Sequence, residues 1–439
     1  MPLPDKRLQA LKTAGPRASA MSKHRSYFLA STALAALLLG GCHKLPPCYQ
    51  AKKAILRPAP KPAQQLLIGI DGSGSMLGHV QAADRGTWET MLQAVKTTAA
   101  GMSGVAVDTY RIGGGTAQKL GSNTTMAANE TCFFKGCGIY PSVASSLQTL
   151  WEIEAAPKKV PLRLLITDLE VNGEDITSLI KAVGQDLDQG ASVGILALKI
   201  PFNGDVYNAK AQKIFNGSLN RPLYLLTTGS SRQVKELLSG IRQKMSLSGV
   251  DTPELSVIDA QAFPEPLTVA KPNGEPGTLK LQRHDYNSRR NSEYVFARLS
   301  SRSPSVILSS LYPWPEGTKP EGFMLANVER IPIPPKTAPT DPGSIALKSV
   351  SLHDSHLRME LAIPSTVEPG LLRATIPAGS LPEPWWISWN RGGPQGADAK
   401  EKTDGLLQLM LILSQKVRDV PNAPPAASFC LAFEFDKSN

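Results

Sequence analysis

The sequence predicts an α/β fold, a doubly wound and mostly parallel sheet, followed by a β-rich, sandwich-like C-terminal region. Two observations support this prediction. Residues 65–248 alternate short, continuous apolar runs with helical patterns, as parallel sheets covered by helices on both faces do. Residues 249–439 contain short strand patterns separated by Gly and Pro turns, a spacing typical of sandwiches. The length of 439 residues fits two or three domains.

In the first part, strands are predicted where apolar residues run without a break, and helices where they recur every three or four positions. Leu66–Ile70 and Leu162–Thr167 are the clearest buried strands. Three consecutive glycines, Gly113–Gly115, predict a hairpin. The expected strands span 66–70, 106–112, 117–120, 162–167, 192–200 and 222–227, and the expected helices span 87–100, 142–154, 176–187 and 231–245.

The C-terminal region is expected to consist mainly of short strands. The segments on either side of residues 353–355 resemble the two arms of a hairpin. One helix is expected near 404–418, where Leu, Met and Val recur on one face. The expected strands span 254–259, 279–283, 293–299, 306–310, 344–352, 357–363, 371–376 and 429–435.

Trp385, Trp386 and Trp389 form the most conspicuous aromatic cluster. We expect them in a strand, where the first and third side chains share one face and the second lies on the other. This placement predicts sandwich core, with an aromatic platform for a sugar or a partner as the alternative.

The first 41 residues have the pattern of an upstream extension followed by an export signal. Lys23, His24 and Arg25 precede the apolar run Tyr27–Leu39, which is shorter than the ~20 residues that span a membrane. The sequence then reaches Gly40-Gly41-Cys42, which resembles the lipobox of bacterial lipoproteins. That resemblance implies cleavage before Cys42 and diacylation of its side chain. A plain signal peptide with a coincidental cysteine is the alternative.

The same resemblance predicts a lipid-anchored protein of the bacterial cell envelope, periplasmic or surface-facing. His43 follows the cysteine, which by analogy favours the outer membrane. Residues 42–64 are rich in Pro and Lys and are expected to form a stalk between the lipid and the first domain.

The basic charge does not indicate nucleic-acid binding. The formal net charge is +10, and half of this excess lies in residues 1–41. Further along the chain, no dense stripe of Lys and Arg is interleaved with aromatic residues.

Cysteine use agrees with export. If Cys42 is lipidated, Cys48, Cys132, Cys137 and Cys430 remain, an even number in an oxidising compartment. Three pairings are possible; our first choice is Cys132 with Cys137 across a short loop, which leaves Cys48 for Cys430. A zinc site is not expected, since neither a C-x2-C nor an H-x3-H pair occurs.

Oxygen-bearing side chains gather after two predicted strands. Asp71-Gly72-Ser73-Gly74-Ser75 follows the first strand, and Asp168 follows the strand at 162–167. Open α/β sheets place their sites at the carboxyl ends of strands. Carboxylates and hydroxyls suit a hard cation, so we expect Mg²⁺, or Mn²⁺ or Ca²⁺ in its place.

These segments resemble the von Willebrand factor A fold and its metal-ion-dependent adhesion site. The D-x-S-x-S motif is matched by Asp71, Ser73 and Ser75, and the fourth ligand position by Asp168. The resemblance covers roughly residues 64–246 and implies a Rossmann-like α/β domain.

The family also has a threonine ligand in an intermediate loop, and here several residues compete for that role. Thr124 and Thr125 lie early for it, while Ser142 stands near the expected position. We therefore expect either Thr125 or Ser142 as the third-loop ligand. Leu169 stands where the family commonly has glycine.

The resemblance implies a binding module and not an enzyme. In the family, the Ser73 and Ser75 hydroxyls would touch the ion directly, while the two aspartates act largely through water. The metal's charge is then poorly neutralised, so its open position favours an Asp or Glu side chain from a protein partner. Adhesion or complex assembly in the envelope is the function this predicts.

Two enzyme-type interpretations of the turn at residues 71–75 fail at particular positions, and a third interpretation predicts no metal. A dinucleotide loop requires glycine at position 77, which is Leu77, and Asp71 would repel a pyrophosphate. A hydrolase elbow needs G-x-S-x-G, and neither Ser73 nor Ser75 has that frame. A structural envelope component whose fold binds no metal remains the alternative function.

Overall fold

The protein is described by a computed structural model. The export signal, Cys42, Cys48 and most of the expected stalk lie outside the described residues. The residues described are 60–121, 124–154, 160–171, 173–208, 210, 212–250, 253–259, 268–270, 280–282, 295–299, 305–311, 327–332, 345–353, 356–368, 370–376, 379, 385–391, 399–419 and 427–435.

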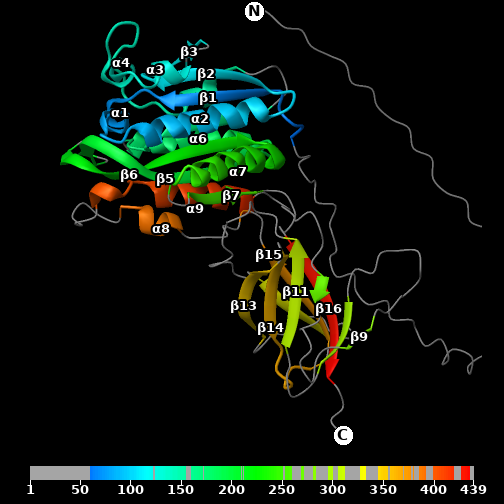
Figure 1. The fold of residues 1–439 in the computed structure, drawn as a ribbon. Helices are drawn as coiled ribbons and strands as arrows, with labels where there is room; N and C mark the ends of the chain where they lie inside the picture. The colour runs from blue at the N-terminus through cyan, green and yellow to red at the C-terminus, as the bar shows by residue number, and fades with distance from the viewer. Residues whose placement is uncertain are drawn as a thin grey trace, which may run out of the picture. The chain divides into compact units, whose positions relative to one another are not determined.

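A seven-stranded sheet forms the centre of the first part (Figure 1), in the order β3-β2-β1-β4-β6-β5-β7. Its middle strands are buried because their apolar residues run without interruption, as expected. The strands are β1 Gln65–Asp71, β2 Ala106–Gly113, β3 Thr116–Leu120, β4 Leu162–Thr167, β5 Ser192–Tyr207, β6 Lys213–Gly229 and β7 Glu254–Ile258.

The sheet is mixed, and the expectation of a mostly parallel sheet is wrong. Only β1 pairs in parallel, with β2 and β4, while every other neighbouring pair is antiparallel. The cause is the β5–β6 hairpin, which pairs without a helix between its strands. A parallel neighbour needs a crossover, usually a helix, and no helix occurs among the described residues between β5 and β6.

Helices cover both faces of this sheet. The side chains of Leu66, Ile68 and Ile70 point to one face, and Leu67 points to the other. The first face is covered by α1 Leu77–Gln81, α2 Gly86–Gly101, α4 Thr131–Lys135 and α7 Ser231–Leu247. The second is covered by α5 Thr149–Glu152, α6 Gly173–Asp188, α8 Trp385–Trp389 and α9 Leu406–Arg418.

A long excursion connects β3 to β4. It contains α3 (Thr124–Ala127), α4 and α5, and the expected Cys132–Cys137 disulfide, with Cα atoms 5.0 Å apart. The helix expected at 142–154 is confined to α5, because residues before it make contacts outside a helix. The Gly114 amide, for example, donates to the Ala144 carbonyl at 2.8 Å.

Two further sheets follow β7. One has five strands in the order β12-β15-β16-β10-β9, and the other has four in the order β13-β14-β11-β8. β13 and β14 form the expected hairpin, in which His353 pairs with His356. Cys430 lies in β16. The strands are β8 Thr268–Ala270, β9 Lys280–Gln282, β10 Val295–Leu299, β11 Ser305–Leu311, β12 Asn327–Pro332, β13 Ala346–His353, β14 His356–Ala362, β15 Gly370–Ile376 and β16 Ala427–Phe435.

The tryptophan cluster is helical, so the expectation of a strand in a sandwich core is wrong. Trp385 and Trp389 pack edge to face in α8, with ring centroids 5.3 Å apart. The Trp385 indole donates to the Ser256 hydroxyl of β7 at 2.8 Å. These tryptophans therefore pack on the seven-stranded sheet, with Trp385 and Trp386 in its core and Trp389 partly buried against it.

Helix α9 also packs on this sheet, beside α6. No helix among the described residues is long and apolar enough to cross a membrane.

We predict that α9 stabilises the α/β part through its buried face. Leu413 is fully buried, whereas Leu411 on the same helix is 44% exposed. Leu413→Ala should lower the free energy of unfolding by about 2–5 kcal/mol, and Leu411→Ala by less than about 1 kcal/mol. Denaturant unfolding of the two variants measures both values. Equal losses would contradict the packing of α9 described here.

Candidate metal centre

Asp71 and Asp168 stand at the ends of two neighbouring parallel strands. β1 ends at Asp71 and β4 ends at Thr167, and their register pairs Ile70 with Ile166. Parallel strands bring their carboxyl ends to one edge of a sheet, so segments almost a hundred residues apart meet there. Both carboxylates are fully buried.

The Asp71 carboxylate ties three segments together. Its Oδ1 accepts from the Ser73 amide at 3.0 Å, which shapes the turn that follows β1. Its Oδ2 accepts from the Thr167 hydroxyl at 2.8 Å and from the Ser145 hydroxyl at 3.3 Å. Asp71 therefore holds the strand ends and the loop before α5 in one place.

The two serines of the turn lie side by side next to these carboxylates. Ser73 Oγ and Ser75 Oγ are 3.1 Å apart, which puts two hydroxyl oxygens on the same side of the turn. The side chain of Ser75 lowers the pKa of Asp168, which favours the ionised form of that carboxyl. The structure thus brings together Asp71, Ser73, Ser75 and Asp168.

Burial opposes the ionisation of both aspartates. Burial, and after it the negative charge of Asp168, raises the pKa of Asp71 to about 6, against the opposing effect of hydrogen bonds from Ser73 and Thr167. Burial likewise raises the pKa of Asp168, against the opposing effect of the Arg221 guanidinium. The pair is therefore short of positive charge.

One oxygen of Asp168 has no partner. Its Oδ1 accepts from the Glu170 amide at 2.9 Å, whereas its buried Oδ2 accepts no hydrogen bond from any residue that the structure describes. A buried carboxylate oxygen without a partner is costly, and a cation is one group that removes the cost.

Arg221 of β6 supplies part of the missing positive charge. Its guanidinium is fully buried and forms an ion pair with Glu170. Burial, and after it the charge of Asp168, raises the pKa of Glu170 to about 8. Arg221 also donates to the Lys400 carbonyl at 2.9 Å, which links the site to the C-terminal segment. Sequence reasoning did not identify Glu170 or Arg221.

The donor set fits a hard divalent cation. Every side chain that could reach the ion presents oxygen, as Mg²⁺, Mn²⁺ and Ca²⁺ prefer. No three His, Cys, Asp or Glu side chains within the described ranges lie close enough together to hold a metal. A cation here would therefore depend on hydroxyls and water as well as on the two aspartates.

The third loop reaches the cluster through Ser145. Ser142 is exposed and has no hydrogen bond to the cluster within the described part, and Thr125 lies in α3. Ser145 was missed because residues 142–154 were expected to be helical, with Ser142 at the start. Ser145 is followed directly by Ser146, so residue type alone does not show which of the two reaches the cluster.

Leu169 adopts a backbone conformation that leucine rarely takes. Its φ is 55°, in the left-handed region, at a cost of roughly 1–3 kcal/mol. Its amide donates to the Thr167 hydroxyl at 3.0 Å, and its side chain is buried. These contacts hold the sharp turn that aims Asp168 at the cluster.

The serines open into a cleft of about 250 Å³. The C-terminal segment contributes Arg391 and Asp404, which form an ion pair at 2.6 Å. The end of β5 contributes Tyr207. The remaining lining residues are Ser73, Gly74, Ser75, Val143, Ala144, Ser145, Glu170, Val171, Asp175 and Asn208.

Comparisons with family models, with curated proteins and with solved structures give no match to this chain.

We predict that ionisation of Asp71 destabilises the metal-free fold. A pKa raised to about 6 from 3.8 gives stability that is fully present below pH 3.8 and is lost as the pH rises through 6. In EDTA, the wild type should lose up to about 3 kcal/mol relative to Asp71→Asn between pH 4 and pH 7. Denaturant unfolding at each pH measures this difference. Parallel pH profiles for the two proteins would count against the raised pKa.

Proposed function

We propose that the α/β part is a von Willebrand factor A-type module that binds an acidic protein partner through a divalent cation. The observation that carries this proposal is the convergence of Asp71, Ser73, Ser75 and Asp168 at one edge of the sheet. There the two serines line a cleft, and the buried Asp168 Oδ2 atom has no hydrogen-bond partner among the described residues. Buried carboxylates without enough neighbouring positive charge are unfavourable. This favours a site that binds a cation over a polar turn without a ligand.

In this proposal the hydroxyls of Ser73 and Ser75 and the two aspartates hold Mg²⁺, Mn²⁺ or Ca²⁺, and Ser145 replaces the third-loop ligand expected at Thr125 or Ser142. The cation supplies a Lewis-acidic position that accepts a carboxylate from the partner. Ser145 and Thr167 keep Asp71 oriented. The role is binding and not catalysis.

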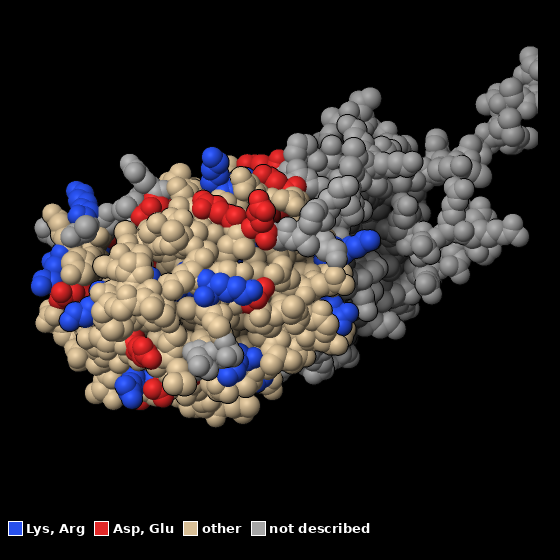
Figure 2. All heavy atoms as spheres, turned by 90° about the horizontal axis from the view of Figure 1, so that it is seen from above, with Lys and Arg blue, Asp and Glu red and all other residues tan. Residues whose placement is uncertain are grey.

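The proposed setting is the bacterial cell envelope. Cleavage before Cys42 and lipidation of its side chain would anchor the chain in a membrane, with the outer membrane favoured. The two C-terminal sheets would pack as a sandwich and serve as a spacer or a second interface. Neither nucleic acid nor nucleotide is proposed as a partner. On the face drawn in Figure 2, basic side chains of described residues are interspersed with acidic ones and form no continuous stripe.

The alternative is a structural envelope component whose A-type fold binds no metal. The network around Asp71 favours this alternative, because its hydrogen bonds join the strand ends and the loop without any ion.

Thermal melts distinguish the two functions. For the metal-binding module, Mg²⁺ or Mn²⁺ at a hundredfold excess over Kd should stabilise the wild type by about 2.7 kcal/mol, a rise in Tm of roughly 5–10 °C. Asp71→Ala should not respond. Asp84→Ala removes an exposed carboxylate and should respond like the wild type. Equal Tm values with and without metal would support the structural component.

Ser145 provides a second prediction. Because its hydroxyl reaches Asp71, Ser145→Ala should weaken Mn²⁺ binding by about fivefold. Ser142→Ala, in the same loop but exposed, should bind like the wild type. Isothermal titration calorimetry measures both constants. A larger effect at Ser142 would restore that residue as the third-loop ligand.

The partner can be sought by capture from envelope extracts. Retention of a partner in Mg²⁺ and its release by EDTA are expected for the wild type, and Asp71→Ala should retain nothing in either condition. A partner held equally by both proteins in EDTA would show binding that is independent of this site.

A further inference from the structure

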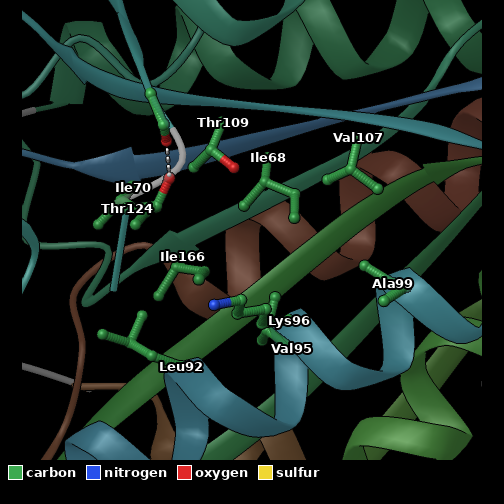
Figure 3. A pocket seen from close by; sticks show the side chains of 12 residues that line it. Ile68, Ile70, Leu92, Val95, Lys96, Ala99, Val107, Thr109, Thr124 and Ile166 are labelled. Carbon is green, nitrogen blue, oxygen red and sulfur yellow. Dashed lines mark hydrogen bonds between the residues drawn. The ribbon is translucent and has the colours of Figure 1, made fainter. Parts of the chain in front are cut away.

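A second cavity, of about 240 Å³, lies between α2 and the sheet and has no assigned role. Ile68 and Ile70 of β1 and Ile166 of β4 form its sheet side, while Leu92, Val95 and Ala99 of α2 form the opposite wall. All six side chains are 5% exposed or less. In Figure 3 they surround the hollow. The inside of the cavity is therefore aliphatic.

The cavity opens where β2 is poorly covered. β3 pairs with Thr109–Gly113, so the first three residues of β2, Ala106–Asp108, have no neighbour on that side among the described strands. Val107, in this stretch, lines the cavity and is 40% exposed. Ala100 and Gly121 on the rim are also exposed and carry little or no side chain. Solvent and small molecules can therefore enter from this side.

Among the described residues, Lys96 is the one charged residue that lines the cavity. Lys96 is exposed, so its ammonium group stands at the mouth of the cavity, and Figure 3 draws the nitrogen on the side of Ile166. No carboxylate within the described part of the chain forms an ion pair with it. The nearby polar groups are the hydroxyls of Thr109 and Thr124, and the second already donates to the Gly121 carbonyl at 2.9 Å.

We propose that this cavity binds a medium-chain aliphatic carboxylate. An apolar wall with one unpaired ammonium is complementary to a ligand with an apolar tail and a single negative charge. A phosphate is a poorer match, because no arginine lines the cavity. A cavity of about 150 Å³ holds benzene, so this one has room for on the order of ten non-hydrogen atoms, the size of octanoate.

The site is separate from the metal centre, although both use β1 and β4. Ile70 and Ile166 directly precede Asp71 and Thr167, yet no residue lines both cavities. The carboxylate-binding proposal does not rest on the proposed function. It is tested in EDTA, which removes divalent cations, so a failure of either proposal does not affect the test of the other.

The experiment is isothermal titration calorimetry of the full chain with octanoate, butyrate, octylammonium and 1-octanol. We expect saturable 1:1 binding of octanoate, on the order of a hundredfold weaker binding of butyrate, and weaker binding of octylammonium. Lys96→Gln should weaken octanoate about tenfold and leave 1-octanol unchanged. Lys244→Gln, which removes an exposed lysine of α7, is the matched control and should change neither ligand.

Two filling variants test the location. Ala99→Leu adds volume inside the cavity, and Val107→Phe adds it at the exposed rim, where less packing is disturbed. Either variant, if its melting curve is that of a folded protein, should abolish binding of octanoate and 1-octanol. Octylammonium binding as tightly as octanoate, or octanoate binding unchanged in Lys96→Gln or in a folded filling variant, would overturn the proposal.

Discussion

The burial of two carboxylates at adjacent strand ends is the constraint on which the rest of the site depends. Asp71 and Asp168 lie out of water, and burial raises the pKa of both carboxyls. The negative charge of Asp168 raises the pKa of Asp71 as well. Hydrogen bonds from the Ser73 amide and the Thr167 hydroxyl offset part of that cost for Asp71. What they leave unsatisfied is charge, because amides and hydroxyls contribute dipoles only. A cation is the simplest group that completes such a site.

The edge that carries the site is assembled from segments far apart in the chain. Tyr224 of β6 donates to the Thr403 hydroxyl at 2.9 Å, and Arg391 donates to the Tyr207 carbonyl at 3.3 Å. The segment 385–419 thus returns, after the two C-terminal sheets, to close the cleft and cover one face of the seven-stranded sheet. Truncation before this segment would remove a wall of the cleft as well as the core contacts of α9.

The sequence was most informative where one local signal decides the structure. Uninterrupted apolar runs predicted β1 and β4, and helical periodicity predicted α2, α6 and α7. Asp71, Ser73, Ser75 and Asp168 were recognisable because they directly follow the ends of predicted strands. Ser145 was not, because loop contacts at Val143 and Ala144 override a helical pattern. The β5–β6 hairpin was not recognisable either. The half of the hairpin nearest its turn is largely polar and solvent-facing, so it lacks the apolar run that marks a buried strand.

That hairpin also explains how Arg221, a residue that no local pattern indicates, reaches the candidate site. Because β6 runs antiparallel to β4, the site receives the middle of β6 and not its carboxyl end. Arg221 arrives there fully buried, between Glu170, with which it is paired, and Asp168, whose ionised form it favours. One guanidinium cannot neutralise two carboxylates while Asp71 stands beside them. Arg221 of the antiparallel strand therefore neutralises only part of the negative charge of the site. A divalent cation can neutralise the remainder.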